Sequence, residues 1–269
     1  MENTKIEWCH HSVSLYWGCT EVHEGCFNCY AKKLAHRWGH DVWGNESPRR
    51  LIKSAFKTLS KIQKQAQKKD EIHRVFIGSM MDVFEKSMPL FDDKTKLIVG
   101  NTGQLREKLF EKISIGEYPN LMFLLLTKRP SNINKYIPES WKTNPPHNVM
   151  FGASVVNQAT ADKLIPQLLE VNGFRFLSVE PQLEELSLLK WLPNGQLHWI
   201  IQGGESGNGR RPFDIEWGRK LKIECALSNV PYFFKQVDKV ITIPEDLMVR
   251  EFYEDSVSNE QNMEVYHGR

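Results

Sequence analysis

Three of the five cysteines in this 269-residue chain lie within eleven residues, in the stretch WGCTEVHEGCFNCYAKKLAHRW (17–38). Cys19 and Cys26 are separated by six residues, and Cys26 and Cys29 by two. A C-x-x-C pair brings two sulfurs within bonding distance of a common metal, and the flexible spacer TEVHEG can bring a third thiolate to the same centre. The spacing therefore predicts that Cys19, Cys26 and Cys29 are metal ligands.

Two kinds of metal centre compete for these thiolates. A structural zinc ion needs four ligands, so it would take a fourth from Cys9, His10, His11 or His23, all close in sequence. A [4Fe-4S] cluster held by three cysteines leaves one iron open to a small molecule, which suits a catalytic centre. Zinc ribbons usually close with a second C-x-x-C pair, which this sequence lacks. The cluster is therefore favoured over zinc, and zinc over unligated thiols.

Polar residues also follow seven short apolar runs, each where the run ends. The runs are expected strands at 12–18, 73–82, 121–130, 148–157, 174–182, 198–207 and 230–236. Their ends carry Cys19; Ser79 and Asp82; Thr127, Lys128 and Arg129; Ser154 and Asn157; Glu180; Gln202 and Glu205; Lys235 and Gln236. Because the carboxyl ends of the strands in a β/α barrel converge on one mouth, we expect a shared polar site there.

The segments between these runs predict the fold. Near-continuous hydrophobicity is typical of parallel strands that are buried on both faces. Candidate helices at 94–114, 157–173 and 214–229, the last with Asp214 as its N-cap, alternate with the strands. The predicted fold class is α/β: a single parallel β/α barrel, complete or partial and TIM-like, with the cysteine loop near the N-terminus.

Composition restricts the class of protein further. Hydrophobic residues make up 41% and charged residues 25% of the chain, and no apolar run approaches the roughly 18 residues that a membrane span needs. The N-terminus lacks the features of a secretory signal, and crowded cysteines suit a reducing compartment, so we expect a cytoplasmic protein. No linker divides the chain. We expect a barrel domain at 1–244 and, where hydrophobic periodicity is lost, a C-terminal tail at 245–269.

Seven ordered motifs resemble a known family. They cover about residues 8–238 and read WGCTEVHEGCFNCYA, GSMMDVFE, LLTKRP, FGASVVN, FLSVEPQL, IIQGGESGNGRRPFDIEW and VPYFFKQ. Together they are similar to a family of bacteriophage and bacterial three-cysteine proteins that is placed with radical S-adenosylmethionine enzymes. The resemblance implies a [4Fe-4S] cluster whose open iron binds S-adenosylmethionine. The spacing C-x6-C-x2-C departs from the usual C-x3-C-x2-C of that superfamily.

The residues at the mouth are assigned expected roles on this basis. The expected cofactor-binding residues are Ser79, Asp82, Ser154, Asn157 and Glu180, with Ser79 and Asp82 standing where the superfamily contacts the amino group of the cofactor. The expected catalytic residues are Asp82, Glu205 and Lys235, and the expected substrate-binding residues are Lys128, Arg129, Arg210 and Arg211, whose charges suit phosphate or carboxylate groups. The structural alternatives are a turn cap for Glu180 and a surface position for Lys128 and Arg129. Because Lys235 is costly to bury unpaired, we expect it to point into the mouth or to pair with a carboxylate such as Glu180.

Three functions remain open from the sequence. The first is a radical S-adenosylmethionine-type enzyme that takes an electron from a flavodoxin-type or ferredoxin-type donor, forms a 5′-deoxyadenosyl radical and acts on an anionic substrate, a nucleotide or nucleic acid. The second is a zinc-stabilised, non-catalytic nucleic-acid-binding protein of phage or bacterial origin that uses the basic segment 47–74. That segment is also typical of the solvated face of a long helix, and the net charge of only +2 does not favour nucleic acid. The third is a barrel that retains the cluster without cleaving the cofactor.

Overall fold

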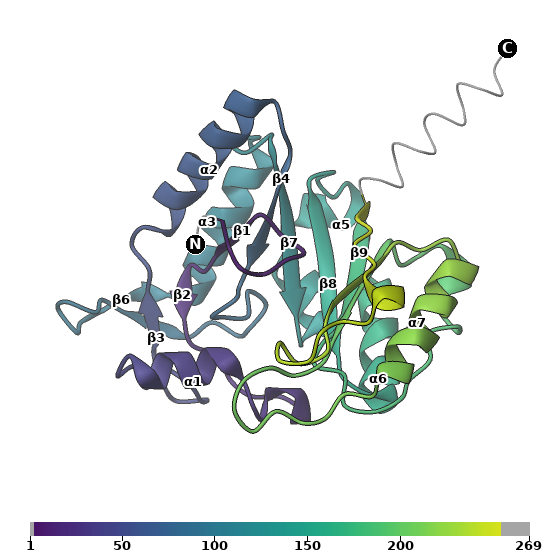
Figure 1. Ribbon diagram of the computed structural model, residues 1–269. Helices are drawn as coiled ribbons and strands as arrows, with labels where there is room; N and C mark the ends of the chain where they lie inside the picture. Colours follow the sequence, from purple (N-terminus) through teal and green to yellow (C-terminus); the bar gives the residue numbers. More distant parts are fainter. Residues whose placement is uncertain (1–2, 254–269) are drawn as a thin grey trace, which may run out of the picture.

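Seven parallel strands form a curled, half-barrel sheet in the computed structural model, which describes residues 3–253. The strands pair in the order in which they occur along the chain (Figure 1): β1 (His11–Val13), β4 (His73–Ile77), β7 (Leu121–Thr127), β8 (Val149–Val155), β9 (Phe174–Val179), β10 (Trp199–Gly203) and β11 (Tyr232–Gln236). Every neighbouring pair is parallel. The predicted α/β class is confirmed, and the barrel is partial.

The six apolar runs from residue 73 onward each contain one of these strands, whereas the first predicted strand is divided. Within 12–18, β1 joins the main sheet and β2 (Tyr16–Trp17) joins a second sheet of four strands. That sheet also holds β3 (Arg49–Leu51), β5 (Pro89–Phe91) and β6 (Ile98–Asn101). The small sheet leads into the cysteine loop, because Cys19 lies two residues after β2.

Helices alternate with the strands, and one of them departs from its predicted bounds. The helices are α1 (Tyr30–Arg37), α2 (Ala55–Lys69), α3 (Thr102–Ser114), α4 (Ile133–Tyr136), α5 (Glu139–Thr143), α6 (Gln158–Leu169) and α7 (Ile215–Leu227), with short 3-10 turns η1 (Glu24–Cys26), η2 (Pro130–Asn132), η3 (Leu192–Asn194) and η4 (Glu245–Leu247). The helix predicted over 94–114 begins only at Thr102, because Ile98 and the residues after it pair as β6 and Asn101 caps the helix in a capping box. The prediction that Asp214 caps α7 is confirmed.

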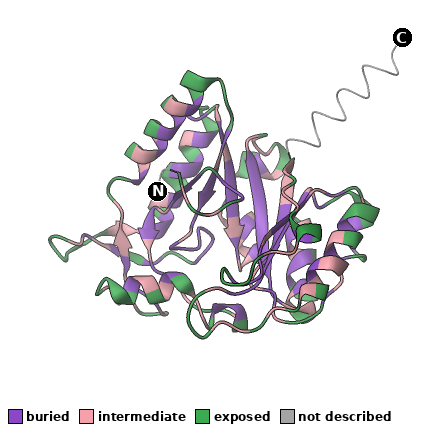
Figure 2. Cartoon of the chain, in the orientation of Figure 1, coloured by how far each residue is buried: buried purple, intermediate pink, exposed green. Residues whose placement is uncertain are grey.

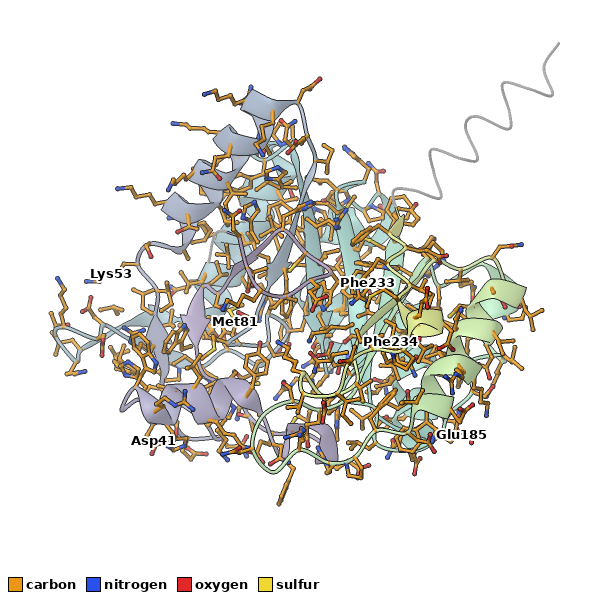
Figure 3. The ribbon with its side chains drawn as sticks, in the orientation of Figure 1. Asp41, Lys53, Met81, Glu185, Phe233 and Phe234 are labelled. Carbon is orange, nitrogen blue, oxygen red and sulfur yellow. The ribbon has the colours of Figure 1, made fainter. Side chains whose placement is uncertain are left out.

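Two hydrophobic clusters lie on the two faces of the curled sheet. The adjacent residues Phe233 and Phe234 of β11 (Figure 3) belong to different clusters, as expected where successive side chains point to opposite faces. Trp8 contacts the rings of Phe76, Phe176 and Trp199, with centroids 4.8, 6.4 and 6.4 Å away. These three rings come from strands that are not all neighbours, so their convergence on one indole places them inside the curl. Figure 2 shows the strands buried and the outer helix faces exposed.

The basic segment and the C-terminal boundary can be placed in the fold. The apolar residues Leu59, Ile62 and Ala66 of α2 are buried while its lysines face solvent, so a solvated helix face is found over Ala55–Lys69. Arg49 of the same basic segment is instead buried in β3. Within residues 3–253, no helix is both long and apolar enough to cross a bilayer. The proposed boundary at residue 245 stays a prediction: Leu247 is buried against α7, and 254–269 lie outside the described residues.

Candidate active site

A cavity of about 860 Å³ opens at the carboxyl ends of the barrel strands. Its lining includes most of the predicted site residues: Cys19, Cys26, Cys29, Ser79, Asp82, Lys128, Arg129, Ser154, Glu180, Glu205 and Lys235. Asn157, Arg210 and Arg211 do not line it. The shared polar mouth predicted from seven strand ends therefore exists, and the structure excludes three of the predicted residues from its wall.

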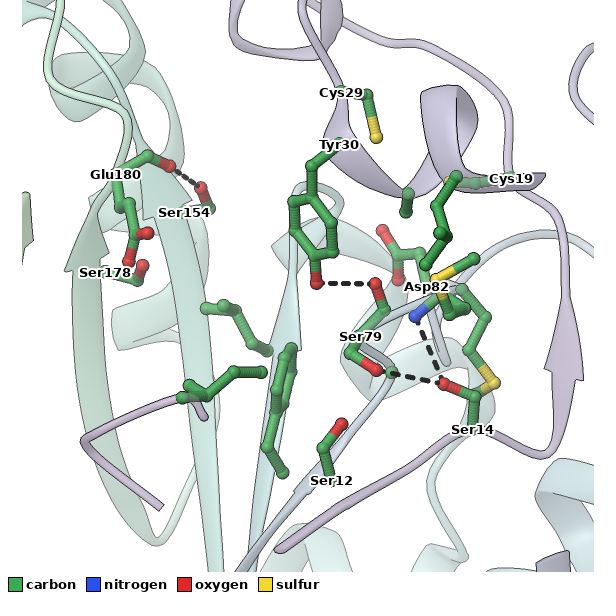
Figure 4. A pocket seen from close by; sticks show the side chains of 18 of the residues that line it. Ser12, Ser14, Cys19, Cys29, Tyr30, Ser79, Asp82, Ser154, Ser178 and Glu180 are labelled. Atoms are coloured by element: carbon green, nitrogen blue, oxygen red, sulfur yellow. Dashed lines mark hydrogen bonds between the residues drawn. The ribbon is translucent and has the colours of Figure 1, made fainter. Parts of the chain in front are cut away.

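The cysteine loop forms one wall of this cavity. Cys19 follows β2, Cys26 closes the 3-10 turn η1, and Cys29 stands immediately before α1. Figure 4 shows Cys19 and Cys29 across the cavity from Ser154 and Glu180. All five cysteines lie within the described residues and are free thiols, so no disulfide competes for the three in the loop.

Cys19 lies beside both charges of an ion pair. Burial first, and then the carboxylates of Asp82 and Glu85, raise the pKa of its thiol to about 12, while Arg129 acts in the opposite direction. The Arg129 guanidinium donates to the Cys19 sulfur at 3.8 Å and to the Thr20 carbonyl at 2.6 Å. The thiol is therefore protonated at neutral pH unless a cation binds to it.

The Asp82 carboxylate accepts hydrogen bonds from the residues at the end of β7. Its Oδ1 accepts the Thr127 hydroxyl at 2.7 Å, and its Oδ2 accepts the Lys128 N–H at 3.2 Å and the Arg129 guanidinium at 2.7 Å. Oδ1 also accepts the Phe84 N–H at 2.9 Å. Because both oxygens are engaged and the side chain is buried, this geometry is that of a positioning residue, and a catalytic role for Asp82 stays a prediction.

Glu180 and Lys235 form an ion pair on the wall of the cavity opposite the cysteine loop. The Lys235 ammonium donates to Glu180 Oε1, which confirms the predicted pairing of this lysine with a strand-end carboxylate. The Ser154 hydroxyl donates to the Glu180 carbonyl at 2.9 Å. Both charged side chains remain partly accessible, with 12% of Lys235 and 18% of Glu180 exposed, so a ligand in the cavity can reach either of them.

The glycine-rich loop after β10 is joined to the cysteine loop. Glu205 Oε2 accepts the Asn28 amide at 2.9 Å, and Oε1 accepts the Arg211 guanidinium at 2.6 Å. Burial alone would raise the pKa of Glu205, but the hydrogen bonds from Arg211 and Asn28 outweigh it and lower that pKa. Arg210 is held similarly by Asp238 at 2.6 Å. The charges of both arginines are therefore neutralised by carboxylates of the protein itself, without any ligand.

The aromatic residue Tyr30 completes the wall together with Ser14 and Asn28, which the sequence did not single out. The Tyr30 hydroxyl donates to the Ser79 carbonyl at 2.7 Å, and Ser79 lies 3.4 Å from the Ser14 hydroxyl (Figure 4). Asn28, between Cys26 and Cys29, also donates to the Gly209 carbonyl at 2.7 Å. The only sequence indication for Ser14 and Asn28 was their position, beside the cysteines or at the end of β1.

Of the side chains considered as a fourth zinc ligand, Cys9, His10 and His11 lie away from the cysteine loop, and His23 keeps Nε2 without a hydrogen-bond partner within the described residues. Cys9 is buried in the cluster inside the barrel, and the rings of His10 and His11 lie 5.1 and 5.0 Å from that of His73. His23 uses Nδ1 as the acceptor for a backbone N–H. Within residues 3–253, no group of three or more His, Cys, Asp or Glu side chains gathers closely enough to hold one metal ion.

The chain belongs to the family described as protein of unknown function DUF5131, whose model matches residues 3–252. No curated protein matches it in sequence. Solved structures of spore photoproduct lyase are similar: one complexed with dinucleoside spore photoproduct (14% identity, TM-score 0.44) and one mutant with bound AdoMet and dinucleoside spore photoproduct (13% identity, TM-score 0.42). Each match covers 80% of this chain, and the chain spans only 61% of the length of each lyase.

Proposed function

We propose that this member of the DUF5131 family is a radical S-adenosylmethionine-type enzyme that holds a [4Fe-4S] cluster on Cys19, Cys26 and Cys29. One observation carries the proposal: three free thiols from a single loop line one cavity of about 860 Å³ at the carboxyl ends of a parallel half-barrel. A cavity of this size accommodates a cofactor together with a small substrate group.

The arrangement of the thiols fits a cluster better than a single ion. A tetrahedral zinc ion with Zn–S bonds of about 2.3 Å needs its sulfurs within roughly 4 Å of one another. A [4Fe-4S] cluster distributes its thiolate ligands over several irons and so accepts a wider spacing. The three cysteines line one cavity and can supply the three thiolates of such a cluster.

The cluster would supply the chemistry, and the side chains around the cavity would bind the cofactor and limit the access of water. Such a cluster, when bound, supplies the electron that cleaves S-adenosylmethionine to a 5′-deoxyadenosyl radical, which abstracts a hydrogen from the substrate. Ser79 and Glu180, on opposite walls of the cavity, would bind polar groups of the cofactor, and Lys235 would orient the Glu180 carboxylate. The contact of Asn28 with Glu205 joins the cysteine loop to the β10 loop and would limit the access of water.

Partners follow from this reaction class. The enzyme would need a flavodoxin-type or ferredoxin-type electron donor, and a cytoplasmic location would suit that chemistry. We further propose an anionic substrate, a nucleotide or nucleic acid. Arg129, Arg210 and Arg211 are each paired with a carboxylate, so among the four predicted substrate-binding residues Lys128 is the one left to meet an anion.

Replacing single cysteines tests the proposal. Cys19→Ala, Cys26→Ala and Cys29→Ala should each lose most of the bound iron after anaerobic purification, because each removes one of three cluster ligands. Cys225→Ala is the matched control, since that thiol is fully buried in α7, far in sequence from the loop. Equal iron content in all four variants would contradict the assignment.

A further inference from the structure

A second cavity, of about 350 Å³, lies on the other side of the cysteine loop. One wall is the spacer between Cys19 and Cys26, represented by Val22, His23 and Glu24. The other walls are the segment after β7, which contributes Lys128 and Arg129, and the first turns of α6 with its cap, which contribute Asn157 and Lys163. Lys128 and Arg129 also line the main cavity, so the two cavities adjoin at these residues.

The charges of this cavity are unbalanced. Three cationic side chains, Lys128, Arg129 and Lys163, line it against one carboxylate, that of Glu24. Arg129 is neutralised by Asp82 at 2.7 Å, and Glu24 accepts the Asn157 amide, which also caps α6. Among residues 3–253, neither Lys128 nor Lys163 has a carboxylate within ion-pair distance, so two positive charges face the cavity without a counterion from the described chain.

His23 adds a hydrogen-bond donor to the same cavity. Its Nδ1 accepts the Gly25 N–H at 3.1 Å, so in the neutral ring the proton is on Nε2. Nε2 is buried and has no hydrogen-bond partner in the part of the chain that the structure describes. A buried donor without an acceptor costs about 1 to 3 kcal/mol, and an acceptor atom supplied by a ligand would remove that cost.

We propose that this second cavity binds a phosphate group through Lys128, Lys163 and the Nε2–H of His23. A phosphate group carries one negative charge as a diester and about two as a monoester, together with several acceptor oxygens, so either form can bind two uncompensated ammonium groups and one free donor. The inference rests on the proposed function in one respect: it takes the phosphate to be part of the substrate, which would lie next to the cysteine loop. Residues 22–24 of the long C-x6-C spacer would then form part of the substrate site.

Binding of phosphate probes to the purified full chain tests the inference without any need for a cluster. Isothermal titration at low ionic strength would use inorganic phosphate, a dinucleoside monophosphate and, as a carboxylate control, acetate. Lys163→Gln should weaken phosphate binding roughly fivefold, because this lysine is exposed, and Lys128→Gln, which is half-buried, roughly tenfold. Lys94→Gln, an exposed lysine between β5 and β6, is the matched control and should bind as the parent does.

The outcomes distinguish a nucleic-acid phosphate from free phosphate, and the phosphate site from the cluster assignment. Loss of dinucleotide and phosphate binding in the same two variants identifies a nucleic-acid backbone as the source, and loss of inorganic phosphate binding alone identifies free phosphate. Acetate binding as tightly as phosphate, or equal binding by parent, Lys128→Gln and Lys163→Gln, overturns the inference. Iron content is unaffected by either lysine variant, so failure here is distinguishable from failure of the cluster assignment.

Discussion

Removing the buried arginine beneath the cysteine loop should destabilise the protein strongly. Arg49 is fully buried and pairs with Glu85, at 3.0 Å through Nε and at 2.7 Å through Nη2. The same guanidinium donates to the Thr20 hydroxyl at 2.9 Å and to the Val42 carbonyl at 2.9 Å. It therefore joins the residue after Cys19 to the connection that leads from α1 to β3.

The expected loss in the free energy of unfolding depends on which groups lose their partners. Arg49→Met leaves the Glu85 carboxylate, 1% exposed, with only Arg129 at 3.9 Å. Breaking a buried pair in this way costs about 3 to 5 kcal/mol in the free energy of unfolding. Glu85→Gln should cost less, about 2 kcal/mol, because the guanidinium keeps its oxygen acceptors on Thr20 and Val42.

Urea denaturation followed by circular dichroism measures these losses. The control is Arg219→Met, because Arg219 is exposed and its pairs with Glu216 and Asp246 are solvated, so a loss below about 1 kcal/mol is expected. The double variant Arg49→Met with Glu85→Gln should lose clearly less than the sum of the two single losses. A loss below 1 kcal/mol for Arg49→Met, or additive losses, would refute the reasoning.

Two further predictions follow from the barrel interior and from its histidines. Gly152→Ala should lower the free energy of unfolding by about 1 to 3 kcal/mol, since the new Cβ would lie 2.4 Å from the Phe176 ring; an unchanged urea midpoint would contradict the packing. Burial first, and then the charges of Arg74, His73 and His11, lower the pKa of His10 to about 4. Between the unfolded value of about 6.5 and this pKa the unfolded chain binds more protons, so stability should fall as pH drops through that range, and His10→Gln should lessen the fall. Parallel slopes for parent and variant in urea titrations from about pH 7 to pH 4 would argue against this assignment.

The sequence predicted the main sheet because its strands are buried on both faces. The main-sheet strands β4, β7, β8, β9, β10 and β11 all lie within predicted runs, since continuous apolar residues have few other places in a β/α protein. The hairpin of β5 and β6 was missed because Leu97, Ile98 and Val99 are apolar yet exposed, and their spacing also suits a helix. Apolar periodicity cannot identify a strand whose side chains are not in a core.

The position of the site could be predicted from the sequence, but the ion pairs among its side chains could not. The strand-end rule brought Cys19, Ser154, Glu180 and Lys235 to one cavity. It could not show that the predicted anion-binding arginines would be neutralised, because their partners are set by tertiary packing, as with Arg129 and a carboxylate 47 residues away. Arg49 was hidden for the same reason, since within a basic run nothing in the sequence distinguishes a buried arginine from a solvated one.

Metal analysis of the anaerobically purified chain tests the central claim most directly. Iron, acid-labile sulfide and zinc would be measured together with the absorption and paramagnetic resonance spectra of the reduced protein, before and after addition of S-adenosylmethionine. We expect a brown protein with about four irons per chain and a resonance signal that changes when the cofactor binds. A colourless protein carrying about one zinc ion would contradict it.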